Sequence, residues 1–273
     1  MYDYQIVINK TNCDGIGNVL KGYVSALSIN DNSVIECNPE YMYGTYDTIL
    51  EDKHIYKDEG QKIERAGTCR LLILKEEEPY QQHTYTGCLD YSGIGNDRLN
   101  HFFCPTLIDW NFNPECVHTI VKNRILANFD KIKFKPIINE SLDKYYQTFK
   151  DNKTLGISIR TWKGLHEHNI QGPYSVEKYI TEIRNVLNIN KDINKIIISI
   201  DNHDYFYDYE TFFKELNIPY EILNKSPDLN HLQYAILKAL ILSRCDFVIG
   251  NRNSTYTELI MWLGRLKCII YPV

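Results

Sequence analysis

The chain has 273 residues, of which 44% are hydrophobic and 24% charged, enough apolar material for one large or two modest domains. Its formal net charge is -5, so no overall basic field favours nucleic acid as a partner. The sequence has no apolar run of the roughly 18 residues that a spanning helix needs, and it does not start with a basic segment followed by an apolar one. We therefore expect a cytoplasmic protein with no transmembrane segment.

The cysteines indicate free thiols in a reducing compartment. There are eight of them, and none forms a Cys-x-x-Cys pair or a metal-finger rhythm. The nearest approach to a metal cluster is Cys104, Cys116 and His118, which lacks a fourth neighbour at suitable spacing. The sequence therefore predicts no metal site and no metal cofactor.

The first half of the chain predicts an α/β arrangement. Residues 4–9 are typical of a strand, residues 18–29 of a helix with one apolar face, and residues 33–36 and 71–74 of further strands. Between them, residues 38–70 form a long stretch rich in tyrosine and charge, a length that is usually functional or partly disordered.

A change of pattern follows in the middle of the chain. Residues 114–129 predict an amphipathic helix, and residues 134–152 combine a break at Pro136 with a polar helix. We place the domain boundary in this region, which predicts an N-terminal domain over residues 1–135 and a C-terminal domain over residues 150–273.

The second half alternates buried strands with helices. The predicted strands are residues 154–160, 195–200, 220–223, 246–250 and 267–271. The first predicted helix begins after a cap at Ser175. Three further helices are predicted over residues 207–216, 229–244 and 254–263. Such alternation favours a doubly wound parallel sheet. The first half repeats this alternation less cleanly. The fold expected is therefore α/β, with two Rossmann-like domains whose parallel sheets face a cleft.

Polar residues follow several of the predicted strands of the second half. In open parallel sheets, ligands bind outside the carboxyl ends of the strands, where helix N-termini offer free N–H groups. A guanidinium there can clamp a diphosphate, and a turn can aim hydroxyl and N–H groups at the same anion. A single arginine after a strand is more often a surface residue, and a single Ser is more often only a helix cap. The joint placement of these residues predicts a diphosphate site: Arg160, Asp201, Asn251, Asn253, Ser254 and Thr255.

Three stretches of the sequence carry recognisable motifs. They are residues 228–263, which begin at Asp228 and contain CDFVIGNRNSTYTE, GISIRTWK at residues 156–163, and Gly15-Ile16-Gly17-Asn18. Together they resemble the fucosyltransferase superfamily that includes the α-1,2-, α-1,6- and protein O-fucosyltransferases. The first is similar to the last motif of these enzymes, the second to their "His-x-Arg-Arg" phosphate motif and the third to their glycine-rich start. The resemblance implies a GT-B-like fold.

The resemblance implies an inverting glycosyltransferase that needs no metal and moves fucose from GDP-fucose to a glycan hydroxyl. It places Arg160 on the arginine that contacts the donor β-phosphate and Asp201 on a carboxylate that recognises guanine. The implied binding residues, apart from these two, are Gly15, Gly17, Asn18, Ser158, Lys163, Asp228, Asn251, Asn253, Ser254 and Thr255.

The sequence also departs from the family pattern. Ser158 stands at the motif histidine and Thr161 at the second arginine, whose charge Lys163 or Arg252 could replace. The candidates for a general base remain open; they are Asp14, His166, Glu167, His168 and Glu258.

Rival interpretations fit less well. A dinucleotide fingerprint at Gly15 and Gly17 lacks its third glycine, because Leu20 occupies that position. A metal-dependent transferase would need Asp-x-Asp after a strand, and Asp201 and Asp204 have the wrong spacing. The main alternative is the same scaffold with another nucleotide sugar, or a binding module without turnover. Acceptor recognition is expected in the N-terminal half, around residues 38–70 and 91–98.

Overall fold

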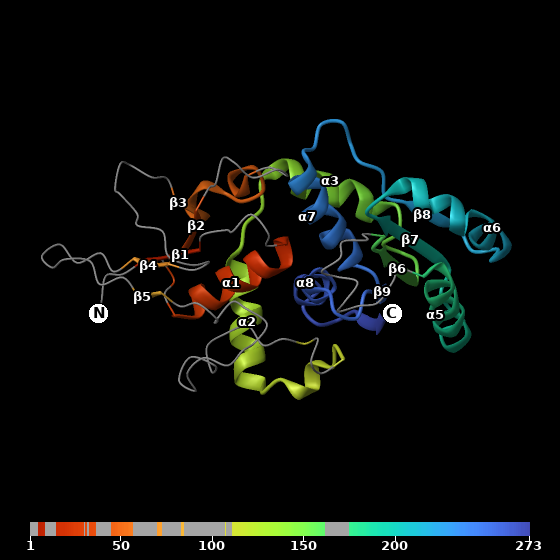
Figure 1. Cartoon of the computed structure of the whole chain (residues 1–273), viewed down its shortest axis with the longest axis horizontal. Helices are drawn as coiled ribbons and strands as arrows, with labels where there is room; N and C mark the ends of the chain where they lie inside the picture. Colours follow the sequence, from red (N-terminus) through yellow and green to blue (C-terminus); the bar gives the residue numbers. More distant parts are fainter. Residues whose placement is uncertain are drawn as a thin grey trace, which may run out of the picture. The chain divides into compact units, whose positions relative to one another are not determined.

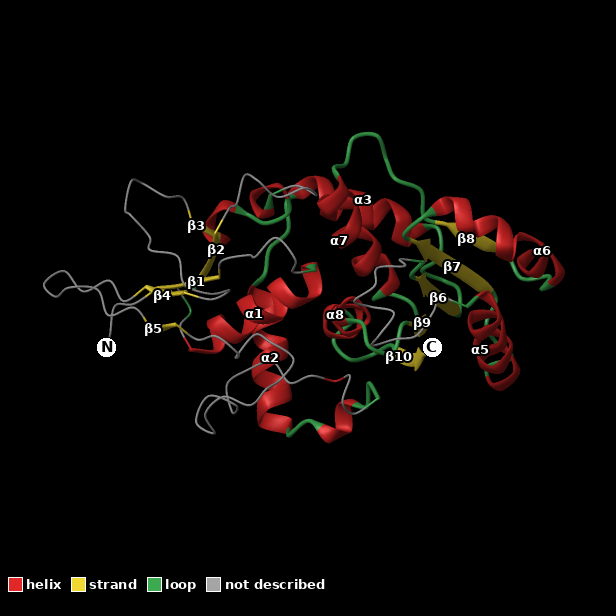
Figure 2. Cartoon of the chain, in the orientation of Figure 1, coloured by secondary structure: helices red, strands yellow, loops and turns green. Residues whose placement is uncertain are grey.

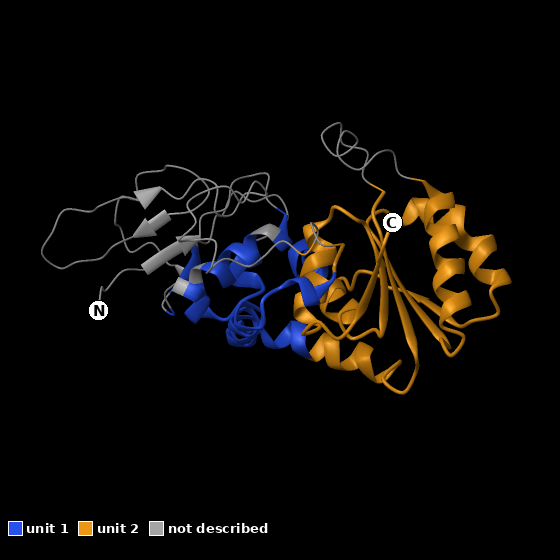
Figure 3. Cartoon of the chain, turned by 90° about the horizontal axis from the view of Figure 1, so that it is seen from below, with its two compact units in different colours: residues 1–106, 113–139, 228–236 blue, residues 107–112, 140–227, 237–273 orange. Residues whose placement is uncertain are grey.

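The computed structural model describes residues 5–8, 15–29, 31, 33–36, 45–56, 70–72, 83–84, 107, 111–161 and 175–273. Two compact units divide the chain, and neither is continuous in sequence (Figure 3). The first comprises residues 1–106, 113–139 and 228–236; the second comprises residues 107–112, 140–227 and 237–273. The predicted domain limits at residues 135 and 150 stay a prediction. Within the described residues, no helix combines the length and hydropathy that a membrane span would require.

The sheet of the first unit is mixed. Its strands are β1 (Gln5–Ile8), β2 (Val34–Glu36), β3 (Ile55–Tyr56), β4 (Arg70–Leu72) and β5 (His83–Thr84), in the order β3-β2-β1-β4-β5 (Figure 1). The pairs β1–β2 and β2–β3 are parallel, whereas β1–β4 and β4–β5 are antiparallel. The expectation of a parallel sheet is therefore wrong on the β4 side. An antiparallel neighbour needs no crossover helix, so strand propensity alone could not distinguish the two pairings.

Helix α1 (Ile16–Ile29) confirms the predicted amphipathic helix and begins two residues earlier. The apolar residues that its sequence spaces along one face are all buried, namely Val19, Leu20, Tyr23, Val24 and Leu27.

The predicted helix at residues 114–129 is displaced toward the C-terminus. Pro114–Cys116 forms a short 3-10 turn instead, held by the Asn113 side chain, which accepts from the N–H of Glu115. Helix α2 (Thr119–Lys131) begins after His118, whose Nδ1 accepts from the N–H of Ile120 at 3.3 Å. Pro136 does not break the next helix but begins it, because a missing N–H costs nothing in the first turn of α3 (Pro136–Gln147).

The second unit contains the predicted parallel sheet, which is confirmed (Figure 2). The strands are β6 (Thr154–Ile159), β7 (Lys195–Ile200), β8 (Tyr220–Ile222), β9 (Phe247–Gly250) and β10 (Ile269–Pro272), in the order β10-β9-β6-β7-β8. The helices between them are α5 (Val176–Ile189), α6 (Tyr207–Glu215), α7 (His231–Leu242) and α8 (Thr255–Leu263), and Ser175 caps α5 as expected.

The two faces of this sheet differ in side-chain size. One face is apolar and packs on α5 and α6 through Ile157, Ile198 and Ile249, among others. The other face includes Ile197 and Val248 but also two glycines, Gly156 in β6 and Gly250 in β9. At these two glycines the helices after β8 and β9 approach the strands closely.

Gly156 shows how close that approach is. A Cβ added there would lie 2.9 Å from Cδ2 of Leu242 and 3.1 Å from Sγ of Cys245. Any larger residue would therefore push the end of α7 away from β6.

The edge strands of the same sheet are short or interrupted. On one edge, β8 has three residues, and its Glu221 lies 3.3 Å from Nζ of Lys195 in an ion pair. On the other edge, β10 ends at Pro272, which has no backbone N–H to donate.

An aspartate ties the start of β6 to the start of β9. Oδ2 of Asp246 accepts from the N–H of Thr154 at 2.8 Å and from its hydroxyl at 3.1 Å, and Oδ1 accepts from Nζ of Lys153 at 2.9 Å. Partial burial opposes the charge, but these bonds outweigh it and hold the pKa of Asp246 below its usual value. The amino ends of two central strands are thus fixed to each other.

A buried histidine serves the first unit in a similar way. His54 lies 5% exposed, with Nδ1 2.7 Å from the Tyr23 hydroxyl and Nε2 accepting from the N–H of Lys133 at 3.1 Å. Burial, with the positive charge of Lys53, lowers the pKa of His54. Because Nε2 must carry a lone pair to accept, the folded state requires the neutral imidazole.

We expect the first unit to lose stability as the pH falls below about 6.5, the ordinary pKa of histidine. In that range the unfolded chain binds a proton at His54 more readily than the folded chain does. His54→Gln should flatten this part of the pH profile, measured as the urea-unfolding midpoint between about pH 7.5 and about pH 5. The exposed His231 provides the matched control, His231→Gln, and an equal flattening in both variants would contradict the assignment.

Candidate functional site

The order of the parallel strands defines where a ligand binds in such a sheet. From β6 the chain adds β7 and β8 on one side, and it then crosses to add β9 and β10 on the other. The connections that leave β6 and β9 therefore run in opposite directions, and this switch point is where open parallel sheets bind ligands. The residues directly after these two strands are Arg160 and Asn251. The structure thus brings Arg160 and Asn251 together at the carboxyl end of the parallel sheet, which we call the site edge.

The backbone at Arg160 is held from α5. Its N–H donates to the hydroxyl of Tyr179 at 3.3 Å, and that hydroxyl donates to the carbonyl of Ser158 at 3.3 Å. Arg160 itself is half-buried, so its guanidinium extends from a fixed stretch of main chain at the end of β6.

Asp201, at the end of β7, holds the next residue of the same loop. Its Oδ1 accepts from the N–H of Thr161 at 2.9 Å and from the Thr161 hydroxyl at 2.6 Å. The same oxygen accepts from the N–H of Asn202 at 2.9 Å. These three hydrogen bonds hold the backbone just past the end of β6 against the end of β7.

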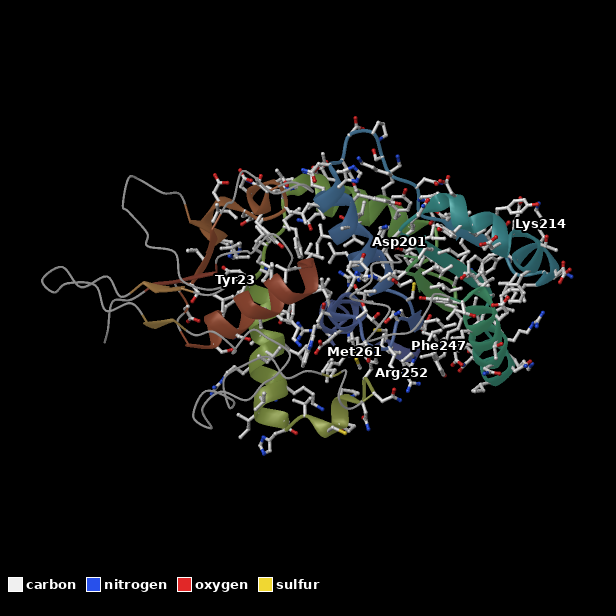
Figure 4. All side chains as sticks on the ribbon, in the orientation of Figure 1. Tyr23, Asp201, Lys214, Phe247, Arg252 and Met261 are labelled. Atoms are coloured by element: carbon white, nitrogen blue, oxygen red, sulfur yellow. The ribbon has the colours of Figure 1, made fainter. Side chains whose placement is uncertain are left out.

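The turn after β9 is ordered by its own side chains. Oδ1 of Asn251 accepts from the N–H of Asn253 at 3.1 Å, and the Asn251 carbonyl accepts from the N–H of Ser254 at 3.3 Å. Val273 donates to the carbonyl of Gly250 at 2.9 Å and accepts from the N–H of Arg252 at 3.0 Å. Figure 4 labels Asp201 after β7 and the exposed Arg252 in this turn.

Helix α8 begins at the end of the turn. Ser254 is its N-cap and accepts from the N–H of Tyr256 at 3.2 Å, and Thr255 is its first residue. The partial positive charge of a helix N-terminus favours anions. The N-terminus of α8 thus adds a partial positive charge at the carboxyl end of the parallel sheet, where Arg160 also follows a strand.

Gly250 sets how closely α8 begins to the strand. A Cβ added at Gly250 would lie 2.6 Å from Cγ2 of Thr257 and 2.7 Å from its Oγ1, and the Thr257 side chain is buried. Only glycine leaves the first turn of α8 where it is.

Glu258, a predicted base candidate, lies inside the protein. It is 0% exposed, and its Oε1 accepts from the N–H of Leu107 at 2.7 Å. This geometry argues for a structural role, since a general base must reach an acceptor hydroxyl.

Lys238 is a residue that the sequence interpretation did not single out. It lies half-buried on α7, with Nζ 3.4 Å from the carbonyl of Ile200, and burial lowers its pKa to about 8 despite the opposing charge of Asp201. Burial and the charge of Lys238 also lower the pKa of His203. A single cation inside the apolar run AILKALIL was the signal available in the sequence.

The remaining predicted residues are distributed as follows. Gly15 and Gly17 lie at the start of α1 and Asp228 lies exposed before α7, all in the first unit. Asn18 belongs to α1. Asp14, Lys163, His166, Glu167 and His168 lie outside the described residues. Within the described part of the chain, no three His, Cys, Asp or Glu side chains gather as a metal site would require.

Comparison with known proteins identifies the fold. No protein-family model matches the chain, and no curated protein matches its sequence significantly. Solved structures do match over nearly the full length, and they are fucosyltransferases of the GT-B type. The resemblance predicted from the sequence motifs is therefore confirmed at the level of the fold.

Two such proteins illustrate the match. The fucosyltransferase NodZ from Bradyrhizobium aligns over 95% of this chain and 92% of its own, with a TM-score of 0.54 and 13% identity. NodZ α-1,6-fucosyltransferase soaked with GDP-fucose aligns over 94% of this chain and 91% of its own, with a TM-score of 0.54 and 13% identity. POFUT1 in its apo form aligns over 100% of this chain and 99% of its own, with a TM-score of 0.54 and 10% identity. In four other POFUT1 structures, with TM-scores from 0.39 to 0.42, the chain spans only 48 to 54% of the POFUT1 length.

We expect Gly250→Ala to destabilise the second unit by about 1–3 kcal/mol, the usual cost of an added methyl group in a packed site. The new Cβ must displace Thr257 and, with it, the first turn of α8. Thermal unfolding measures the loss, and adding Thr257→Ala should restore part of it. Gly15→Ala is the control, because nothing lies within 4 Å of a Cβ there. Equal stability of Gly250→Ala and the unmodified protein would contradict the tight contact.

We expect Lys238→Met to stabilise the protein near neutral pH. The pKa of Lys238 is about 8 in the folded protein, against an ordinary value of 10.5. Below pH 8 the amine is charged in both the folded and the unfolded chain, so the full cost of burying this charge opposes folding. The unmodified protein should gain stability as the pH rises between these values, because there the unfolded chain binds more protons.

Urea unfolding at about pH 7 and about pH 10 tests this expectation. The difference between the two pH values should shrink in Lys238→Met and persist in Lys144→Met, which changes an exposed lysine on α3. A destabilised Lys238→Met with an unchanged pH difference would show that burial imposes no cost on this lysine.

Proposed function

We propose that the protein is an inverting fucosyltransferase that transfers fucose from GDP-fucose to a hydroxyl of a glycan acceptor. The observation that carries the proposal is the near full-length likeness to NodZ, whose structure was determined after soaking with GDP-fucose. The chemistry of the switch point in the second unit supports it independently of that likeness.

In our proposal the carboxyl end of the parallel sheet binds the diphosphate of the donor. Arg160 follows β6, and the turn from Gly250 to Thr255 follows β9 and leads into the N-terminus of α8. A guanidinium and helix N–H groups are the donors that proteins use for phosphate oxygens. In our proposal these groups bind the diphosphate, while the first unit supplies acceptor contacts.

The same groups account for the bond-breaking step. When the bond from the sugar to the phosphate oxygen breaks, negative charge grows on the departing diphosphate and positive charge on the sugar ring. Fixed positive charge at the phosphates stabilises that state more than the ground state, which lowers the barrier. In this proposal Arg160 is the residue that does so, in a reaction that the family resemblance implies needs no metal.

The base for the acceptor hydroxyl comes from elsewhere in the chain. Glu258 is buried and bonded to Leu107, so we do not assign it this role. Asp14, which precedes α1 in the sequence, is the candidate that we retain.

One observation favours a second candidate, a scaffold that binds a different nucleotide sugar or binds without turnover. Thr161 stands where the resemblance expects a second arginine, and its hydroxyl is bonded to Asp201. One cation fewer at the phosphates would weaken leaving-group stabilisation more than it weakens binding.

Nucleotide binding separates these candidates. We expect GDP and GDP-fucose to raise the melting temperature of the protein, because a ligand that binds only the folded state stabilises it. UDP and CMP should have little effect. A preference for UDP would remove the fucose assignment, and GDP binding without hydrolysis or transfer would favour the module without turnover.

We expect Arg160→Ala to weaken GDP binding by about 10- to 100-fold, in line with the loss of hydrogen bonds to a charged group. The melting temperature of this variant should be nearly unchanged, since Arg160 is only half-buried and follows the last residue of β6. Isothermal titration calorimetry measures the change in affinity. The control is Arg184→Ala, which alters an exposed arginine of α5 that lies over the ring of Phe212 in α6. An affinity for GDP that matches in both variants would refute the site.

A further inference from the structure

The carboxylate of Asp201 accepts hydrogen bonds from backbone N–H groups and from a hydroxyl group of the protein itself. One oxygen, Oδ1, takes both donors of Thr161 and the N–H of Asn202. Thr161 is 4% exposed, so an N–H left without this acceptor would pay the cost of an unmade buried hydrogen bond. Asp201 therefore fixes where the loop leaves β6.

Arg160 lies between two such anchors. On one side its own N–H is bonded to Tyr179 of α5, and on the other side the N–H of the next residue is bonded to Asp201 after β7. Two elements that are separate in sequence thus fix the peptide groups that flank the arginine. A side chain that leaves from a fixed main chain loses less freedom when it binds a ligand.

Lys238 places a positive charge at the same point. Its Nζ lies 3.4 Å from the carbonyl of Ile200, the residue before Asp201, and the charge of Asp201 acts on Lys238. The ammonium group therefore offsets the negative charge of Asp201, which would otherwise repel an anion bound nearby.

We propose that Asp201 is a positioning residue for Arg160, which it orients through the N–H and hydroxyl of Thr161 so that the guanidinium is set to receive a diphosphate. This inference rests on the proposed function for the identity of the anion. The inference also accounts for the threonine at position 161, where the resemblance expects a second arginine. Its hydroxyl, bonded to Asp201, fixes the backbone next to Arg160 instead of adding a second charge.

A double-mutant cycle tests the proposal. Thr161→Val removes the hydroxyl but keeps the N–H and the side-chain volume, so the protein should still fold. Affinities for GDP and for inorganic pyrophosphate are measured by calorimetry in the unmodified protein, Thr161→Val, Arg160→Ala and the combined variant. We expect Thr161→Val to weaken both probes about fivefold, a size typical of one coupled contact.

The pattern across the cycle decides between positioning and other roles. If Thr161 acts through Arg160, Thr161→Val should have no further effect in the Arg160→Ala background, and Thr161→Ser should restore affinity. The same fivefold loss in both backgrounds would overturn the proposal. A loss for GDP with none for pyrophosphate would also overturn it, because it would indicate a contact with the nucleoside instead of the phosphates.

Two further measurements keep this test separate from the proposed function. Thr148→Val, which removes an exposed hydroxyl bonded to the carbonyl of Tyr145, should leave both affinities unchanged. If the unmodified protein binds pyrophosphate but not GDP, the donor assignment fails, while the cycle on pyrophosphate still decides whether the bond between Asp201 and Thr161 positions Arg160. If it binds neither, both proposals fail.

Discussion

The arrangement of the second unit depends on two aspartates that hold β6 at its opposite ends. Asp246 accepts from the N–H and hydroxyl of Thr154 at the start of the strand, and Asp201 accepts from the same two groups of Thr161 just past its end. The two aspartates belong to the segments of β9 and β7, which flank β6 in the sheet. Each carboxylate therefore links a strand end to its neighbour, and together they fix the three central strands. The candidate site lies at the end that Asp201 holds.

The second requirement is the difference between the two faces of the sheet. Large apolar side chains pack on α5 and α6, whereas glycines on the other face let α7 and α8 come close. Because Gly250 admits Thr257, the first turn of α8 begins directly after β9. The same closeness brings Lys238 of α7 to the end of β7. The chemistry of the edge thus follows from side-chain size along the strands.

Much of this unit could be predicted from the sequence, because each of the central strands β6, β7 and β9 is a short, largely apolar segment followed by a polar residue. The placement of Arg160 and Asn251 at one edge followed from the rule that parallel strands end together. The partners of side chains did not follow. Whether Asp201 meets Thr161, Glu258 meets Leu107 or Lys238 meets Ile200 depends on packing between segments distant in sequence. The antiparallel pairing of β4 and the start of α2 at Thr119 escaped prediction because pairing direction and local caps leave weak signals in strand and helix periodicity.

The edges of the parallel sheet have a consequence for the behaviour of the chain in concentrated solution. An exposed edge strand can pair with a strand of another molecule, which is a common route to aggregation. Here one edge offers only the three residues of β8, with a charged pair between Glu221 and Lys195, and the other carries Pro272, which cannot donate a ladder hydrogen bond. Among the described residues neither edge presents a long, uninterrupted template, so growth of the sheet from one molecule to the next is disfavoured at both sides.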